Sequence, residues 1–149
     1  MTTAGPLEAA AVRISEAGAG NYTQAISNGR HEWTADEPAT AGGRDQGPTP
    51  YELLCSAVGA CVAITVRMYA DHKGWPLESI SVDVKHGRVH ADDCADCETK
   101  KGMIDHLYKT VRLVGDLDDD QFARLMQVAD RCPVHRTLTR EIRIVTSRG

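Results

Sequence analysis

Residues 49–71, TPYELLCSAVGACVAITVRMYAD, decide the fold of this chain. Thr49 can serve as a helix N-cap, Pro50 suits the first helical position, and Glu52 can close a capping box. From there to about Asp71 the residues are almost continuously apolar. A helix that is apolar on most of its circumference is enclosed on most sides. We therefore expect one long core helix.

The first third of the chain reads as strands and turns. Segments near 8–16, 21–27 and 30–36 have the character of strands, and Asn28-Gly29 between two of them is typical of a hairpin turn. A loop over 37–49, rich in Gly and Pro, leads into the long helix.

After the long helix the chain returns to strands. Alternating apolar residues predict a strand over 80–84, and a second strand over 107–113 follows a polar excursion at 90–102. Helical spacing with an acidic first turn predicts a helix over 118–129. A last strand is expected near 141–146.

This order of elements predicts an α+β fold with mostly antiparallel pairing. We expect an antiparallel sheet of about six strands packed on the long buried helix, in a single domain over 1–149. One small chain can cover only part of such a helix. A homodimer that sheaths the helices jointly is the expected solution.

Length, charge and hydropathy exclude several classes of protein. The 149 residues suit one domain, and the formal net charge is −4 with no Lys/Arg block, which argues against nucleic acid or an anionic membrane surface as partner. The N-terminal segment lacks the pattern of a secretory signal. No stretch was expected to reach the roughly 18 apolar residues needed to span a bilayer. These features predict a cytoplasmic protein.

The five cysteines are the main candidates for chemistry: Cys55, Cys61, Cys94, Cys97 and Cys132. An odd number without an export signal argues against a static disulfide framework, which leaves packing, metal binding or redox chemistry. Cys61 lies on the core stripe of the long helix, where a free cysteine often packs as a small hydrophobe. Cys55 lies on another side of the helix and is interpreted as packing.

Cys132 directly precedes Pro133, a pattern typical of an N-cap followed by the first helical position. Unpaired backbone N–H groups, the helix dipole and the neighbouring Arg131, His135 and Arg136 predict a lowered thiol pKa there. The alternative is a helix break with an incidental thiol.

Cys94 and Cys97 form a C-x-x-C pattern in the polar excursion, with His86 and His90 upstream. Two Cys and two His could bind zinc. The alternative is a solvated turn that forms a labile disulfide.

Two segments carry a resemblance to a known family. Residues 47–61, GPTPYELLCSAVGAC, and 129–138, ADRCPVHRTL, resemble the helix motif and the C-P-V segment of the OsmC/Ohr family, the osmotically inducible and organic hydroperoxide resistance proteins. The order of elements is similar over nearly the whole chain. The sequence looks closer to the OsmC-like branch than to the organic hydroperoxide resistance members.

The resemblance implies a thiol-dependent peroxidase that needs no metal or organic cofactor. Cys61 would attack an organic hydroperoxide and become a sulfenic acid, Cys132 would condense with it to a disulfide, and an external dithiol would reduce the disulfide. The implied fold is an intertwined homodimer.

The sequence departs from the family in its auxiliary residues. Tyr51 stands where organic hydroperoxide resistance members carry a Glu, and the turn at 18–21 lacks their Arg. Glu52 is the neighbouring carboxylate, although the capping box also explains it. Arg44, otherwise a solvent-exposed loop cation, could reach Cys61 instead. The alternatives to a peroxidase are a dimer that binds zinc and one that holds an apolar ligand beside the long helix.

Overall fold

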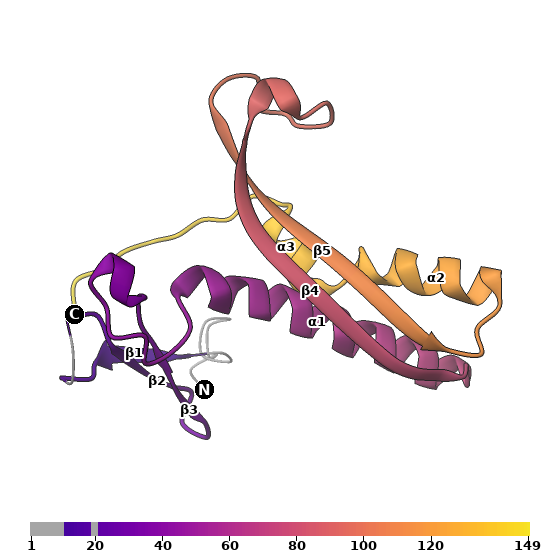
Figure 1. Ribbon diagram of the computed structural model, residues 1–149, viewed down its shortest axis with the longest axis horizontal. Helices are drawn as coiled ribbons and strands as arrows, with labels where there is room; N and C mark the ends of the chain where they lie inside the picture. The colour runs from indigo at the N-terminus through magenta and orange to yellow at the C-terminus, as the bar shows by residue number, and fades with distance from the viewer. Residues whose placement is uncertain (1–10, 19–20) are drawn as a thin grey trace, which may run out of the picture. The chain divides into compact units, whose positions relative to one another are not determined.

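The computed structural model describes residues 11–18 and 21–149 (Figure 1). The chain forms two compact units, Met1–Leu53 and Leu54–Gly149. The prediction of a single domain over 1–149 stays a prediction. The part of the predicted first strand before residue 11, and residues 19–20 of the turn at 18–21, lie outside the described residues.

The first unit contains an antiparallel sheet of three short strands in the order β1-β2-β3. They are β1 (Arg13–Glu16), β2 (Gln24–Ser27) and β3 (Glu32–Ala35). The predicted turn joins β2 to β3: Asn28 Oδ1 accepts hydrogen bonds from the backbone N–H groups of Arg30 and His31. Gly29 has a φ of 84°, which glycine adopts without steric cost.

Asp36 organises the loop that follows β3, which includes the short 3-10 helix η2 (Ala39–Ala41). Its side chain is 2% exposed and accepts hydrogen bonds from the Thr23 hydroxyl and from the backbone N–H groups of Glu37, Arg44 and Gln46. Burial raises the pKa of the Asp36 carboxyl, but these hydrogen bonds outweigh burial and hold the pKa below its usual value. The loop is thus built around one buried carboxylate.

The long helix is α1 (Pro50–Lys73). Its predicted start is confirmed, because Thr49 Oγ1 accepts from the Glu52 N–H at 3.2 Å and Glu52 Oε2 accepts from the Thr49 N–H at 2.7 Å. The helix ends at Gly74, whose φ is 64°. Within the second unit, Gly59 is buried against Val82 and Val84, so a larger side chain at this position would displace the strand that carries them.

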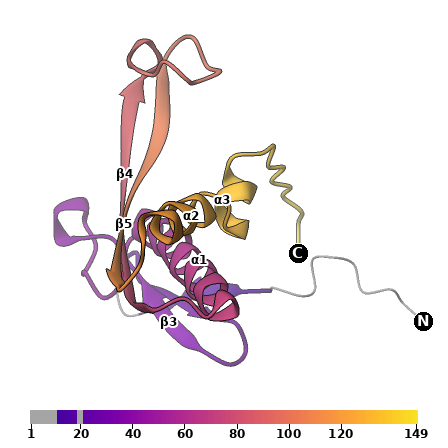
Figure 2. The same ribbon diagram turned by 90° about the vertical axis from the view of Figure 1, so that its right-hand side faces the viewer.

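Two long strands form the sheet of the second unit: β4 (Leu77–His90) and β5 (Met103–Gly115). They pair antiparallel from Leu77 opposite Gly115 to His90 opposite Met103. Side chains alternate between the two faces of such a hairpin. One face presents a row of apolar residues to the helices: Ile80, Val82, Val111 and Leu113. The end of the hairpin that carries residues 91–102 extends beyond the helices (Figures 1 and 2).

Two helices complete the second unit: α2 (Asp119–Ala129) and α3 (Pro133–Leu138). The side chains of Asp118 and Gln121 form a reciprocal capping box at the start of α2. The core lies between α1, α2 and the hairpin (Figure 2). It consists of Val62, Val66, Ala70, Leu77, Leu125, Val128, Ala129 and Cys132.

The α+β class with antiparallel pairing is confirmed, but its strands differ from expectation. The described residues hold five strands, divided between a three-stranded and a two-stranded sheet. Residues 141–149 have no regular secondary structure, so the strand expected near 141–146 is not observed. Ile144 is 89% and Val145 71% exposed. A strand needs backbone partners, and the second unit alone supplies none for this apolar segment.

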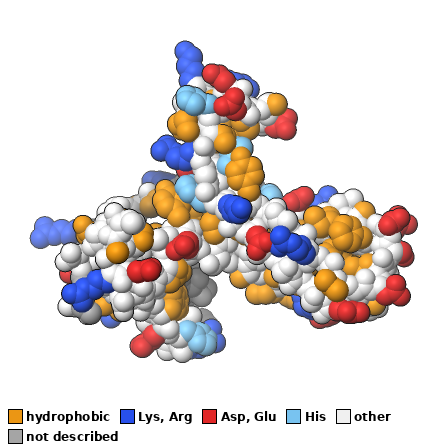
Figure 3. All heavy atoms as spheres, viewed as in Figure 1, with side chains coloured by type: hydrophobic (Ala, Val, Ile, Leu, Met, Phe, Trp, Pro, Cys, Tyr) orange, Lys and Arg blue, Asp and Glu red, His pale blue; other side chains and the backbone are white. Residues whose placement is uncertain are grey.

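The expectation that no segment is apolar enough to span a bilayer was wrong. By length and composition α1 passes that test, although the core helix of a soluble protein also does. Only 22% of its most apolar 18-residue window is buried. Ile64 and Met68 are 59% and 67% exposed. Hydrophobic side chains reach the surface at the end of the second unit where α1 and α2 lie (Figure 3), so this helix is only partly covered.

Candidate functional site: the Cys61–Cys132 thiol pair

The second unit brings Cys61 and Cys132 together. Cys61 is half-buried on α1, and Cys132 is the N-cap of α3 with none of its surface exposed. The two side chains are hydrogen-bonding neighbours, and both thiols are free. Packing of α1 against the segment between α2 and α3 creates this contact.

The start of α3 supplies a backbone donor to each sulfur. The N–H of Val134 donates to Cys61 Sγ at 3.5 Å, and the N–H of His135 donates to Cys132 Sγ at 3.3 Å. Pro133 at the first helical position has no N–H of its own and sets the backbone for these two donors. Such donors favour the charged form of a thiol.

Burial raises the pKa of the Cys132 thiol, and the contact with Cys61 raises it further. The N–H of His135 and the charge of Lys109 oppose this rise without cancelling it. The sequence-based expectation of a lowered pKa at Cys132 was therefore wrong. The capping donor is present as predicted, but desolvation of a fully enclosed sulfur outweighs it.

Lys109 is the charged group beside the thiol pair that the sequence reasoning missed. Its side chain is 15% exposed, and its Nζ lies 3.0 Å from Asp130 Oδ1. It also donates to the Ala129 carbonyl at 2.7 Å and lies 3.0 Å from His135 Nδ1. The signal was available: Lys109 occupies an inward-facing position of β5 between Leu107 and Val111, where an unpaired charge is costly.

His135 completes this polar cluster. Burial lowers the pKa of its imidazole, and the charge of Lys109 lowers it further, while Asp130 opposes the shift. A neutral His135 can accept a hydrogen bond from the Lys109 amino group at Nδ1, which fits the 3.0 Å separation. Asp130 and His135 thus hold the Lys109 amino group beside the start of α3.

A cavity of ≈ 210 Å³ shares Lys109 and His135 with the polar cluster, although neither cysteine lines it. Val58, one helical turn before Cys61, lines it together with Leu107 and Leu138, and Lys109 and His135 form part of its polar wall. The cavity is small and mixed in character, so it suits a compact ligand with an apolar body and one polar end.

Arg44 and Glu52 are the auxiliary site residues predicted from the sequence. Arg44 and Glu52 belong to the first unit, where the Arg44 backbone N–H donates to Asp36 and Glu52 closes the helix cap. Hydrogen bonds from Thr49 lower the pKa of the Glu52 carboxyl. A role for either residue beside Cys61 stays a prediction. Cys55 is a half-buried free thiol on α1.

Cys94 and Cys97 form a disulfide at the tip of the β4–β5 hairpin. The histidine beside them is His106 rather than His86 or His90. His86 instead pairs with Asp105 at 2.9 Å, because the strand register directs it to the opposite face from His106.

The second unit is thus an α+β unit in which half-buried Cys61 of α1 meets buried Cys132 at the start of α3. The family model of OsmC-like proteins matches residues 43–147. The chain belongs to this family.

Solved structures support the same fold. One, described as an organic hydroperoxide resistance protein OsmC and predicted redox protein from Legionella pneumophila, matches with a TM-score of 0.61 and 18% identity over 87% of this chain and 88% of that one. An OsmC-like protein from Mycoplasma pneumoniae matches with a TM-score of 0.65 and 18% identity, over 87% of this chain and 86% of that one. An organic hydroperoxide resistance protein from Elizabethkingia anophelis matches with a TM-score of 0.63 and 16% identity, over 93% of this chain and 91% of that one. No curated protein matches.

Proposed function

We propose that this protein is a thiol-dependent peroxidase that reduces organic hydroperoxides to alcohols through Cys61 and Cys132. One observation carries the proposal: the two thiols are neighbours, and each accepts a backbone N–H from the start of α3. A pair joined only by packing would not need a donor aimed at each sulfur. Family membership and the similar hydroperoxide resistance structures agree with this role.

The surroundings of the two sulfurs support a division of roles between them. Cys61 is the more accessible of the two and lies three residues after Val58 of the cavity wall on α1, which supports it as the group that meets substrate. Cys132 is fully enclosed, and its raised pKa keeps it a thiol at neutral pH. A protonated Cys132 can donate to the Cys61 sulfur and wait as the resolving group.

The reaction balances with one hydroperoxide and one external dithiol. The Cys61 thiolate attacks the distal peroxide oxygen, the O–O bond breaks, and the alkoxide leaves as an alcohol after it takes a proton. The resulting sulfenic acid condenses with the Cys132 thiol, which forms the disulfide and releases water. The external dithiol then exchanges with this disulfide and becomes a disulfide itself.

Lys109 and the cavity would assist the proposed reaction in two ways. The Lys109 charge, held by Asp130 and His135, favours thiolate at Cys132 as the sulfenic acid is resolved. The apolar part of the cavity, Val58, Leu107 and Leu138, fits the alkyl group of an organic hydroperoxide better than it fits hydrogen peroxide.

A homodimer completes the protein in this proposal. A second copy would cover two surfaces: the apolar stripe of α1 with exposed Ile64 and Met68, and the segment at 141–149 with exposed Ile142, Ile144 and Val145. Size-exclusion chromatography with light scattering tests this: Ile64→Glu should shift the protein from dimer to monomer. A monomeric unsubstituted protein would contradict it. We also propose a cytoplasmic location, where dithiol reductants are abundant.

Disulfide mapping tests the peroxidase directly. Reduced protein treated with one equivalent of cumene hydroperoxide should give a peptide that joins Cys61 to Cys132. In Cys132→Ser the same treatment should leave a sulfenic acid on Cys61 that dimedone captures, whereas Cys55→Ser should behave as the unsubstituted protein. If Cys61 and Cys132 remain free thiols after the hydroperoxide is consumed, the assignment fails.

A further inference from the structure

The tip of the β4–β5 hairpin is a folded loop with its own hydrogen bonds. It begins with the 3-10 helix η3 (Ala91–Asp93), and the N–H of Ala91 donates to the Gly102 carbonyl at 2.8 Å. The N–H of Cys94 donates to Ala91, and Lys100 Nζ donates to the Cys97 carbonyl at 3.0 Å. Ala91 is buried. These contacts hold the C-x-x-C loop in one position against the end of the sheet.

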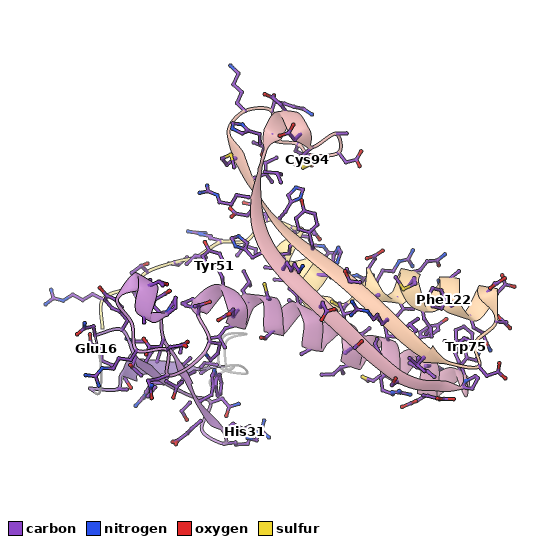
Figure 4. All side chains as sticks on the ribbon, in the orientation of Figure 1. Glu16, His31, Tyr51, Trp75, Cys94 and Phe122 are labelled. Atoms are coloured by element: carbon purple, nitrogen blue, oxygen red, sulfur yellow. A yellow bond between two sulfur atoms is a disulfide. The ribbon has the colours of Figure 1, made fainter. Side chains whose placement is uncertain are left out.

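Three side chains of metal-binding type meet at this tip. One donor atom each from Cys94, Cys97 and His106 lie within 4.8 Å of one another. Cys97 Sγ is 3.9 Å from His106 Nε2. The two cysteines come from the loop and the histidine from β5, so the hairpin register brings them together (Figure 4, where Cys94 is labelled).

His106 is oriented as a metal-binding histidine would be. Its Nδ1 lies 2.9 Å from the hydroxyl of Tyr108, and the two rings pack with centroids 5.2 Å apart. When Nδ1 carries the proton and donates it to Tyr108, the lone pair of Nε2 faces the sulfurs. Metal-binding histidines commonly hold their second ring nitrogen in this way.

We propose that the reduced hairpin tip binds one Zn²⁺ through Cys94, Cys97 and His106, and that the Cys94–Cys97 disulfide closes this site. Two sulfurs and one imidazole form a donor set that zinc prefers, and water takes the fourth tetrahedral position. The site becomes available when an external dithiol reduces the disulfide to two thiols and is itself oxidised. Zinc then binds the two thiolates, and two protons are released.

This site is independent of the thiol pair. None of its three residues lines the cavity that Lys109 and His135 share, and its histidine lies on the opposite face of the hairpin from Lys109. The zinc site can therefore fail while the peroxidase proposal stands, and the reverse also holds.

Zinc titration of the full chain against a chromophoric chelator tests the proposal. Protein reduced with a phosphine and then desalted should bind one zinc per chain, and protein with the disulfide intact should bind none. Cys61→Ser/Cys132→Ser should keep this stoichiometry, and Cys94→Ser/Cys97→Ser should lose it. Reduced protein that binds no zinc, or equal binding after removal of Cys94 and Cys97, overturns the proposal.

Three single substitutions test the role of His106. His106→Ala should weaken zinc binding at least about tenfold, and Tyr108→Phe should weaken it about tenfold through the lost partner of Nδ1. His86→Ala is the matched control on the opposite face and should change nothing. Equal affinities for His106→Ala and His86→Ala would show that the histidine is not a ligand. Cobalt substitution should show thiolate charge-transfer absorption only while Cys94 and Cys97 are reduced.

Discussion

The thiol pair Cys61–Cys132 and the tip pair Cys94–Cys97 place the same side chain in two different surroundings. The first two cysteines are distant in sequence, and they meet where α1 packs against the start of α3. The second two are separated by two residues in a loop at the hairpin end. Burial governs the chemistry of the first pair, whereas local loop geometry and one histidine govern the second.

The two pairs also differ in what brings their sulfurs together. A C-x-x-C pattern brings its sulfurs together by chain geometry alone, so a disulfide follows with little help from the fold. A pair of cysteines distant in sequence meets only when α1 and the start of α3 pack against each other, as they do here. The distant pair is accordingly the candidate active site.

The largest expected effect is a difference in peroxidase rate between substitutions in the two cysteine pairs. Cys61→Ser should lower the rate of cumene hydroperoxide consumption with a dithiol by a factor of about a hundred or more, because the reacting thiolate is lost. Cys97→Ser should leave that rate unchanged. A coupled assay of dithiol oxidation measures both. Equal loss in the two variants would break the distinction.

A second test compares the accessibility of the thiols. In fully reduced protein with a metal chelator present, iodoacetamide should modify Cys94 and Cys97 before Cys132. Cys132 should react more slowly, because burial raises its pKa and leaves little accessible thiolate. Timed peptide mass spectrometry gives the order. Early modification of Cys132 would assign the exposed, reactive role to it rather than to Cys61.

A third test concerns Lys109, whose charge acts on Cys132 of the thiol pair. Lys109→Met should slow formation of the Cys61–Cys132 disulfide about tenfold after oxidation, because Cys132 loses the charge that favours its thiolate. Its pH profile should move to higher pH, and Lys109→Arg should recover part of the rate. Lys85→Met, on the exposed face of the same hairpin, is the control. An unchanged pH profile for Lys109→Met would remove the lysine from the mechanism.

The smallest expected effect is on stability. The folded pKa of His135 lies below its unfolded value, so the fold favours neutral imidazole. Its contribution is complete above the unfolded pKa near 6.5 and is lost as pH falls through the folded pKa. Urea unfolding should show a loss of at most about 1 kcal/mol from this group. His135→Gln should flatten that acid dependence, and an unchanged slope would contradict it.

Several features of the fold followed from the sequence because they are local. The capping box of Thr49 and Glu52, the turn at Asn28-Gly29 and the helix ending at Ala129 each depend on neighbours within a few residues. The apolar run of α1 predicted a long helix, and the residues around Cys61 and Cys132 were enough to suggest the family.

The tertiary structure alone decided which charges and rings meet the sulfurs. Lys109 approaches the thiol pair, and His106 rather than His86 faces Cys97, because a strand register spanning the whole hairpin fixes which face each side chain occupies. Burial raises the pKa of Cys132, whereas its local helix cap alone predicts a lowered pKa. Local sequence determines which backbone donors a cysteine receives, but desolvation depends on every element packed around it.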